Sequence, residues 1–211
     1  MKNRFLFSTL LVLFITVFTA CKNDDDSTNS TTKTYPKTFG IFTVVDANTI
    51  TMDGEIGHNS KKNFDKLIAE YSEINQINIV EILGSNNDEV NLQLSKTVYQ
   101  NNINTHLNDN GLIASGGVDF FLSGHKRTKG TNTKIGVHSW GGEDDNGNEV
   151  TATDFPEGHE YHLPYIEYYK SVGFSQEEAE AFYYFTINAA SFDSIHWMTD
   201  AEIEQYKLLK E

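Results

Sequence analysis

The chain has 211 residues, 38% of them hydrophobic and 22% charged, and its formal net charge at neutral pH is -14. This excess of carboxylates argues against binding of nucleic acid and against adsorption to anionic lipid headgroups, since both attract basic surfaces. The length and composition suit one domain with a sizeable core.

The first segment of the chain predicts export. Lys2 and Arg4 precede an apolar run over 5–18, and small residues then lead to Cys21, the only cysteine. The run is too short for a membrane span and is typical of a secretory signal peptide. A cysteine directly after the small residues resembles the cleavage box of bacterial lipoproteins. We therefore expect a signal peptide over 1–20 and a lipid anchor, of palmitate type, on Cys21; an ordinary cleaved signal with an idle cysteine is the alternative.

The expected location is the cell envelope, with the protein anchored by its lipid to the periplasmic or surface face of the outer membrane. Residues 21–38 are rich in Ser, Thr and Asn and cannot bury a core, which predicts a disordered polar tether. The folded domain is then expected over 39–211. Loss of Lys2 and Arg4 with the signal takes the formal charge from -14 to -16.

The first half of the domain alternates predicted strands and helices. Alternating β-branched residues predict strands over 39–45 and 49–52. Apolar residues at helical spacing predict a helix over 61–72, and a continuous apolar run predicts a buried strand over 77–83. A helix between two such strands makes a right-handed crossover unit.

The pattern continues toward a short apolar segment. A polar loop over 84–89 precedes a helix predicted over 90–102, and a strand is expected over 104–107. The sequence Asn-Asp-Asn-Gly over 108–111 predicts a turn. Repetition of strand and helix predicts a parallel sheet wound with helices.

The next segment contains the strongest candidate for chemistry. An apolar run ends in Ala-Ser-Gly-Gly, with Ser115 as its serine, and an apolar amphipathic run follows at once. This predicts a sharp strand-to-helix turn that exposes the serine hydroxyl beside the unbonded N–H groups of the first helical turn. A strand expected over 134–137 then leads to His138. Nucleophile, backbone donors and base are the parts of an acyl-transfer site, although the tetrapeptide alone is equally typical of a small residue in a tight turn.

These residues resemble a known family. Ala-Ser-x-Gly, an apolar helix ending in Gly124, a basic residue and an apolar strand with His138 resemble the proteolytic subunit of Clp protease, in the Clp/crotonase superfamily. The resemblance extends over about 49–202. It implies an α/β fold in which repeated ββα and βαβ units form a parallel sheet with helices packed around it. It also implies that Ser115 is the nucleophile and His138 the general base.

The resemblance implies an oxyanion hole as well, in altered form. A gapless alignment places Asn87 and Asp88 where the superfamily has two glycines, one of which donates its N–H to the oxyanion. We expect the Gly116 N–H, together with a backbone N–H near Asn87 or Asp88, to hold the oxyanion. A carboxylate at Asp88 opposes a developing negative charge and is the strongest argument against ordinary acyl chemistry. Capping of the following helix is the other role of this loop.

The third member of a catalytic triad is expected near the C-terminal end. Alignment of Trp197 with the family's aromatic residue places Ile195 where the triad aspartate normally lies. Asp193 is two residues earlier on the same alternating face, and we predict that it orients His138. A backbone carbonyl, Asp119 or Asp154 are the alternatives.

Two histidines offer a competing metal site. His159 and His162 lie three apart, a spacing at which a helix lets both bind one ion, with His138 and Asp154 as further ligands. No third spacing supports this, so the predicted site has no metal and no cofactor. The same histidines also suit a substrate cleft or the protein surface.

The remaining elements are a loop and helices. A polar stretch over 141–148 predicts a flexible loop that acts as a lid or faces solvent. Helices with many aromatic residues are predicted over 165–172 and 175–187, and capping boxes are predicted at Ser175 and Thr199. The aromatic residues suit the core or a contact between subunits, and self-association into a homo-oligomer is expected from the superfamily.

The sequence therefore predicts a serine hydrolase of peptidase type on an exported lipoprotein, acting on a peptide or small acyl substrate without nucleic acid or ATP. A binding lipoprotein that keeps the fold without the chemistry is the alternative, and a metal-dependent hydrolase is the third hypothesis.

Overall fold

The computed structural model describes residues 33–144 and 146–211. The predicted signal peptide, Cys21 and the tether as far as residue 32 lie outside the described residues. The first strand begins at Lys37, ahead of the predicted domain boundary at residue 39. Within the described part of the chain, no helix combines the length and the apolar character needed to cross a membrane.

An eight-stranded sheet forms the centre of the fold. Its strand order is β1-β2-β3-β4-β5-β7-β10, and β6 pairs with β5 off this path. The strands of this sheet are β1 (Lys37–Phe39), β2 (Phe42–Val44), β3 (Thr49–Met52), β4 (Gln76–Ile82), β5 (Asn104–Ala114), β6 (Arg127–Lys129), β7 (Lys134–Val137) and β10 (His196–Trp197). Strands β3 to β7 pair in parallel, whereas β1, β2 and β10 join the two edges in antiparallel pairs. The predicted class, an α/β fold with a mostly parallel sheet, is confirmed.

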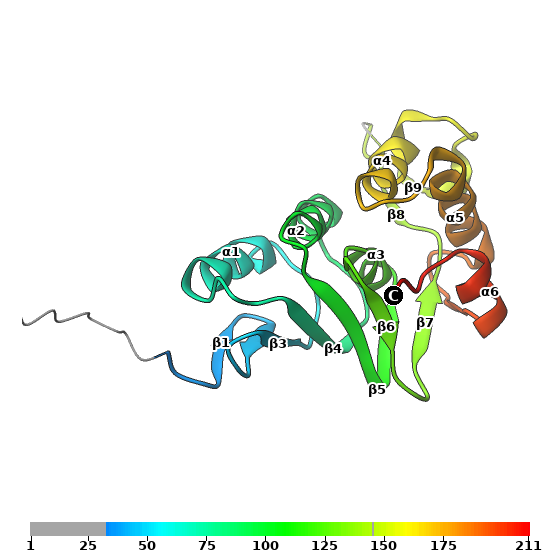
Figure 1. Ribbon diagram of the computed structural model, residues 1–211. Helices are drawn as coiled ribbons and strands as arrows, with labels where there is room; N and C mark the ends of the chain where they lie inside the picture. Colours follow the sequence, from blue (N-terminus) through cyan, green and yellow to red (C-terminus); the bar gives the residue numbers. More distant parts are fainter. Residues whose placement is uncertain (1–32, 145) are drawn as a thin grey trace, which may run out of the picture. The chain divides into compact units, whose positions relative to one another are not determined.

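The parallel strands are connected by helices α1 (Ser60–Glu70), α2 (Asp88–Gln100) and α3 (Gly116–Leu122). Helices α4 (Leu163–Ser171), α5 (Gln176–Ala189) and α6 (Asp200–Gln205) come after β7. In Figure 1, α1, α2 and α3 lie on the same side of the sheet, as right-handed crossovers in one direction require. The predicted capping boxes of Ser175 with Glu178 and of Thr199 with Glu202 begin α5 and α6.

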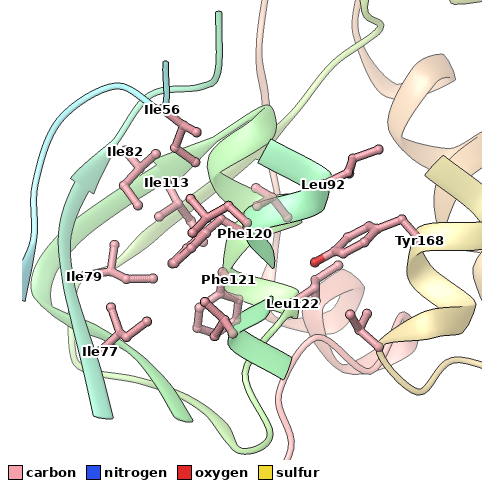
Figure 2. Close-up of a cluster of buried hydrophobic side chains, with 14 of the residues drawn as sticks. Ile56, Ile77, Ile79, Ile82, Leu92, Ile113, Phe120, Phe121, Leu122 and Tyr168 are labelled. Atoms are coloured by element: carbon pink, nitrogen blue, oxygen red, sulfur yellow. The ribbon is translucent and has the colours of Figure 1, made fainter. Parts of the chain in front are cut away.

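The core lies between the sheet and this layer of helices. Ile77, Ile79 and Ile82 of β4 are fully buried, and their side chains lie opposite Phe120 and Phe121 of α3 (Figure 2). On β3, β4 and β5, the residues that alternate with the buried ones include polar, partly exposed side chains, for example Thr51, Asn78 and His106. Burial of one face fixes the register of the strands, because a slip of one residue exposes the isoleucines. The same packing holds α3 rigidly beneath the turn that precedes it.

Strand β5 differs from the prediction of a turn over 108–111. The strand continues through this stretch to Ala114, and Asn110 adopts a left-handed conformation with φ +59°. Its first half pairs with β6 and its second half with β7, so the irregular residues mark the change of partner strand. Asn-Gly chemistry here produces a bulge within a strand instead of a chain reversal.

Two other stretches also differ from the predictions. The single strand expected over 39–45 is a hairpin of β1 and β2, because Gly40 turns the chain with φ +63°. The loop expected over 141–148 contains β8 (Gly141–Glu143), which pairs antiparallel with β9 (Glu149–Thr151). Residues 138–140 connect β7 to this hairpin.

Candidate active site

Ser115 occupies the corner between β5 and α3. Its backbone has φ +53° and ψ -130°, a conformation that costs a non-glycine residue on the order of 1–3 kcal/mol. Two backbone hydrogen bonds hold the corner: the Ser115 N–H donates to the Gly136 carbonyl at 3.0 Å, and the Val118 N–H donates to the Ser115 carbonyl at 2.8 Å. The serine side chain makes no capping bond to α3, so its hydroxyl remains available.

The two glycines after Ser115 are needed for close packing. A Cβ atom on Gly117 would lie 2.4 Å from the Ile82 carbonyl oxygen, and one on Gly116 would lie 2.3 Å from Ser85 Oγ. Asn91, which is fully buried on α2, donates its side-chain N–H to the Gly116 carbonyl at 2.8 Å. The first turn of α3 is therefore fixed against β4 and α2, and the N–H groups of this turn have no acceptor within the helix.

His138 follows β7 and lines the same cavity as Ser115. We call this space the Ser115 cavity; its walls come from the start of α2, from α3, from the end of β7 and from α4 and α5. Among the described residues, no hydrogen bond joins the Ser115 hydroxyl to His138. The Nδ1 atom of His138 is buried and has no hydrogen-bond partner in the described structure.

The structure does not bring Asp193 to His138. Asp193 is exposed, and its carboxylate accepts a hydrogen bond from the Ser191 hydroxyl at 2.6 Å. The alternative partner Asp154 accepts from the Thr151 N–H and caps a short 3-10 helix, η1 (Ala152–Asp154). Ser115 and His138 therefore line one cavity, and no carboxylate of the described residues is hydrogen-bonded to the Nδ1 atom of His138.

Two of the three expected oxyanion residues line the Ser115 cavity. These are Gly116 and Asp88, whereas Asn87 does not line it. The Asn87 side chain instead caps α2 by accepting from the Val90 N–H at 2.9 Å, and it also bonds to His58.

The carboxylate of Asp88 is held by two hydroxyl groups. Ser85 donates to one of its oxygens, and Tyr165 of α4 donates to the other at 2.5 Å. Burial, together with the charge of Asp88, raises the pKa of the Tyr165 hydroxyl, so this group stays protonated and remains a donor. The two hydrogen bonds stabilise the negative charge of Asp88, which faces the cavity.

Asp119 adds a second carboxyl group to the cavity wall. It lies one helical turn after Ser115 and accepts a hydrogen bond from the Tyr169 hydroxyl at 2.7 Å. Burial, with a smaller contribution from the charge of Asp88, raises the pKa of Asp119 to about 7, even though the hydrogen bond from Tyr169 acts in the opposite direction. Asp119 lies four residues after Ser115, and on a helix this spacing places both residues on the same face, which was the sequence signal for Asp119 in the site. Nothing local in the sequence places Tyr165 beside Asp88.

The histidines of the metal hypothesis have other partners. His162 is buried, with Nδ1 2.6 Å from the Tyr183 hydroxyl and Nε2 3.2 Å from the Pro156 carbonyl oxygen. His159 Nδ1 accepts from the Tyr161 N–H at 3.3 Å. Within the ranges that the structure describes, no group of three His, Cys, Asp or Glu side chains converges in a way that suits a metal ion.

Comparisons with known proteins extend the fold assignment. A comparison with protein-family models gives no match, and a comparison with curated proteins gives none either. Among solved structures, a mutant of ClpP1 from Listeria monocytogenes is similar, with a TM-score of 0.52 and 18% identity over 78% of this chain and 90% of that chain. A mutant of the 1510-N membrane-bound stomatin-specific protease has a TM-score of 0.50 and 21% identity over 77% of this chain and 75% of that chain. At these identities the similarity shows a shared Clp-like fold.

Proposed function

We propose that this protein is a serine hydrolase of peptidase type, with Ser115 as nucleophile and His138 as general base. The observation that carries the proposal is the geometry of the serine corner. Ser115, a strained non-glycine residue whose hydroxyl makes no capping bond, lines the same cavity as His138 and Gly116, the first residue of α3. The Clp-like fold, shared with a structure named as a protease, supports peptide bonds as the target.

The proposed reaction proceeds through an acyl-enzyme. Ser115 Oγ attacks the carbonyl carbon of the substrate while His138 accepts the hydroxyl proton, and His138 then gives this proton to the departing amine. Water, deprotonated by His138, attacks the ester and releases the acid. The Gly116 N–H donates to the oxyanion, a contact worth about 100- to 1000-fold in kcat where it has been measured.

The position of Asp88 favours one alternative, a non-catalytic binding protein. Its carboxylate lines the cavity in which an oxyanion would form, and repulsion between the two disfavours the tetrahedral intermediate. The hydroxyl donors Ser85 and Tyr165 weaken this repulsion without removing it. The same experiment separates the two functions.

The test is labelling with a fluorophosphonate probe, which reacts with activated serines. We expect the wild-type protein to be labelled, Ser115→Ala to be unlabelled and His138→Ala to react about 100-fold or more slowly, since a general base contributes at least that much. Ser72→Ala removes an exposed hydroxyl outside the cavity and is the matched control, which should label like the wild type.

Two results contradict the proposal. Persistent labelling of Ser115→Ala assigns the nucleophile to another residue. A wild-type protein that is folded, by circular dichroism, and resists the probe excludes an activated serine and favours the binding protein.

We further propose that the enzyme is an exported lipoprotein attached to the cell envelope through Cys21. The sequence pattern around this cysteine supports the proposal. Growth of the producing bacterium with an alkyne-labelled fatty acid should label the wild-type protein and leave Cys21→Ser unlabelled and outside the membrane fraction. Equal membrane recovery of both proteins contradicts lipid anchoring at this residue.

A further inference from the structure

A groove opens beside the Ser115 cavity. It runs between α2 and the segment that contains α4 and the 3-10 helix η2 (Glu160–His162), and its volume is about 860 Å³. Asp88, Trp140 and Tyr165 line both the groove and the cavity. The groove and the cavity therefore adjoin at these three residues, and a segment bound in the groove lies next to the Ser115 cavity.

The groove carries a strongly negative charge. Its acidic lining residues are Asp88, Glu89, Glu143, Glu160 and Glu167, and Lys96 is the only basic residue among those that line it. Glu143 and Glu160 are exposed, and within the described residues their carboxylates have no hydrogen-bond or ion-pair partner. Unpaired carboxylates in a concave site concentrate cations, and the chain's formal charge of -14 adds to the attraction.

The inner end of this path is also acidic. Asp88 and Asp119 both face the Ser115 cavity, and each accepts hydrogen bonds from tyrosine hydroxyls. Burial, with a smaller contribution from the charge of Asp88, raises the pKa of Asp119 to about 7 and so keeps part of this group protonated near neutral pH. A cation placed between the two carboxyl groups relieves the repulsion and favours the ionised form of Asp119.

Apolar and aromatic residues complete the groove. Leu92, Leu163 and Pro164 lie along it together with Trp140 and Tyr161. Lysine and arginine bury their aliphatic stems on such surfaces while the charged ends bind carboxylates, and their charges are attracted to aromatic faces. The combination suits long cationic side chains better than short polar or acidic ones.

We propose that the substrate of this enzyme is a polypeptide segment rich in lysine or arginine, with one cationic side chain directed toward Asp88 and Asp119 beside Ser115. The cleavage part of this inference rests on the proposed function, whereas the binding part does not require catalysis. The experiment therefore measures binding to a protein that cannot cleave.

The probe is a fluorescein-labelled ten-residue peptide of alternating lysine and alanine, and binding to the Ser115→Ala protein is followed by fluorescence anisotropy at 150 mM salt. A peptide with norleucine in place of each lysine is the uncharged analogue of similar length. We expect the lysine peptide to bind at least about tenfold more tightly. Replacement of the two unpaired carboxylates in Glu143→Gln/Glu160→Gln should weaken the lysine peptide about fivefold, as loss of two exposed ion pairs implies, and leave the norleucine peptide unchanged.

The matched control is Glu177→Gln/Glu204→Gln, which removes the same charge from exposed positions outside the groove. Unchanged affinity in this variant supports the groove as the binding site. If both double variants weaken binding equally, the overall charge of the protein attracts the peptide, and the inference is overturned. If the lysine and norleucine peptides bind with equal affinity, the groove does not select cations, and the inference is overturned as well. Fluorophosphonate labelling without selectivity for lysine overturns only this inference, whereas selective binding without labelling overturns only the proposed hydrolase.

Discussion

The buried carboxyl group of Asp119 gives the protein a predictable dependence of stability on pH. Its pKa is about 7 in the folded protein against 3.8 for the free group, mainly because burial penalises the charge. Between these two pH values the folded state binds more protons at this position than the unfolded state. The contribution of Asp119 to stability therefore falls as pH rises through this window, and it reaches its lowest value above about pH 7.

The size of the effect follows from the two pKa values. Each unit of difference corresponds to about 1.4 kcal/mol, so a shift of about three units destabilises the folded protein at pH 8 by up to about 4 kcal/mol relative to pH 3. Because the side chain borders a cavity and keeps some contact with solvent, the measured effect should be smaller. Asp119→Asn removes the titrating group and leaves an oxygen that still accepts from Tyr169.

The measurement is urea unfolding, followed by tryptophan fluorescence, of the wild type and Asp119→Asn at several pH values from 4.5 to 8. We expect the variant to gain stability over the wild type steadily as pH rises, by about 2 kcal/mol or more across the range. Asp109→Asn is the control of opposite sign, because hydrogen bonds from the Thr131 backbone and side chain lower the pKa of Asp109. The stability that Asp109 provides is present above pH 3.8 and is lost only below it, so this variant should be less stable than the wild type by an amount that does not change over the range.

A flat difference between Asp119→Asn and the wild type refutes the reasoning. It means that Asp119 is ionised throughout in the folded protein, so that water or a neighbouring charge compensates its burial. In that case the charge of Asp88 does not hold Asp119 protonated inside the Ser115 cavity.

Three further predictions concern the serine corner. Gly117→Ala should destabilise the protein by about 1–3 kcal/mol in urea unfolding, because the added Cβ would meet a backbone carbonyl. The control Gly142→Ala has no atom within 4 Å of its added Cβ and should stay within about 0.5 kcal/mol of the wild type. Equal stability of the two variants would disprove the close packing at Gly117. Asn91→Ala leaves the buried Gly116 carbonyl without its donor and should lower the free energy of unfolding by about 1–3 kcal/mol. It should also slow fluorophosphonate labelling. Labelling at the wild-type rate would show that this hydrogen bond does not position the serine site. Ser115→Gly should be more stable than Ser115→Ala by about 1 kcal/mol or more, since glycine adopts positive φ without strain; an equal or lower midpoint would argue against strain at this corner.

Local patterns predicted the elements that depend on local physics. The strand over 134–137, the helix directly after Ser115 and the capping boxes at Ser175 and Thr199 are all present as expected. Each of these depends on residues within a few positions of one another, so a short stretch of sequence contains the whole cause. The parallel order of the central strands followed from the alternation of strands and helices.

The features that sequence reasoning missed depend on distant residues. Tyr165 and Asp88 are 77 positions apart and meet only because α4 folds back toward the start of α2. The Asn-Asp-Asn-Gly segment has the composition of a turn, yet β5 runs through it because two different strands pair with its two halves. The prediction that Asp193 orients His138 came from alignment spacing alone, and spacing does not determine whether a loop turns its carboxylate toward a ring or toward Ser191.

The backbone of Ser115 also has an evolutionary consequence. Random substitution tends to erode stability, and selection keeps a chain only just above the threshold that its function needs. At position 115, glycine would fit the left-handed turn with less strain, so the corner offers a simple route to a more stable protein. With Ser115 as the proposed nucleophile, the chain keeps a hydroxyl at a position where glycine would give a more stable fold, so this corner exchanges stability for the proposed chemistry.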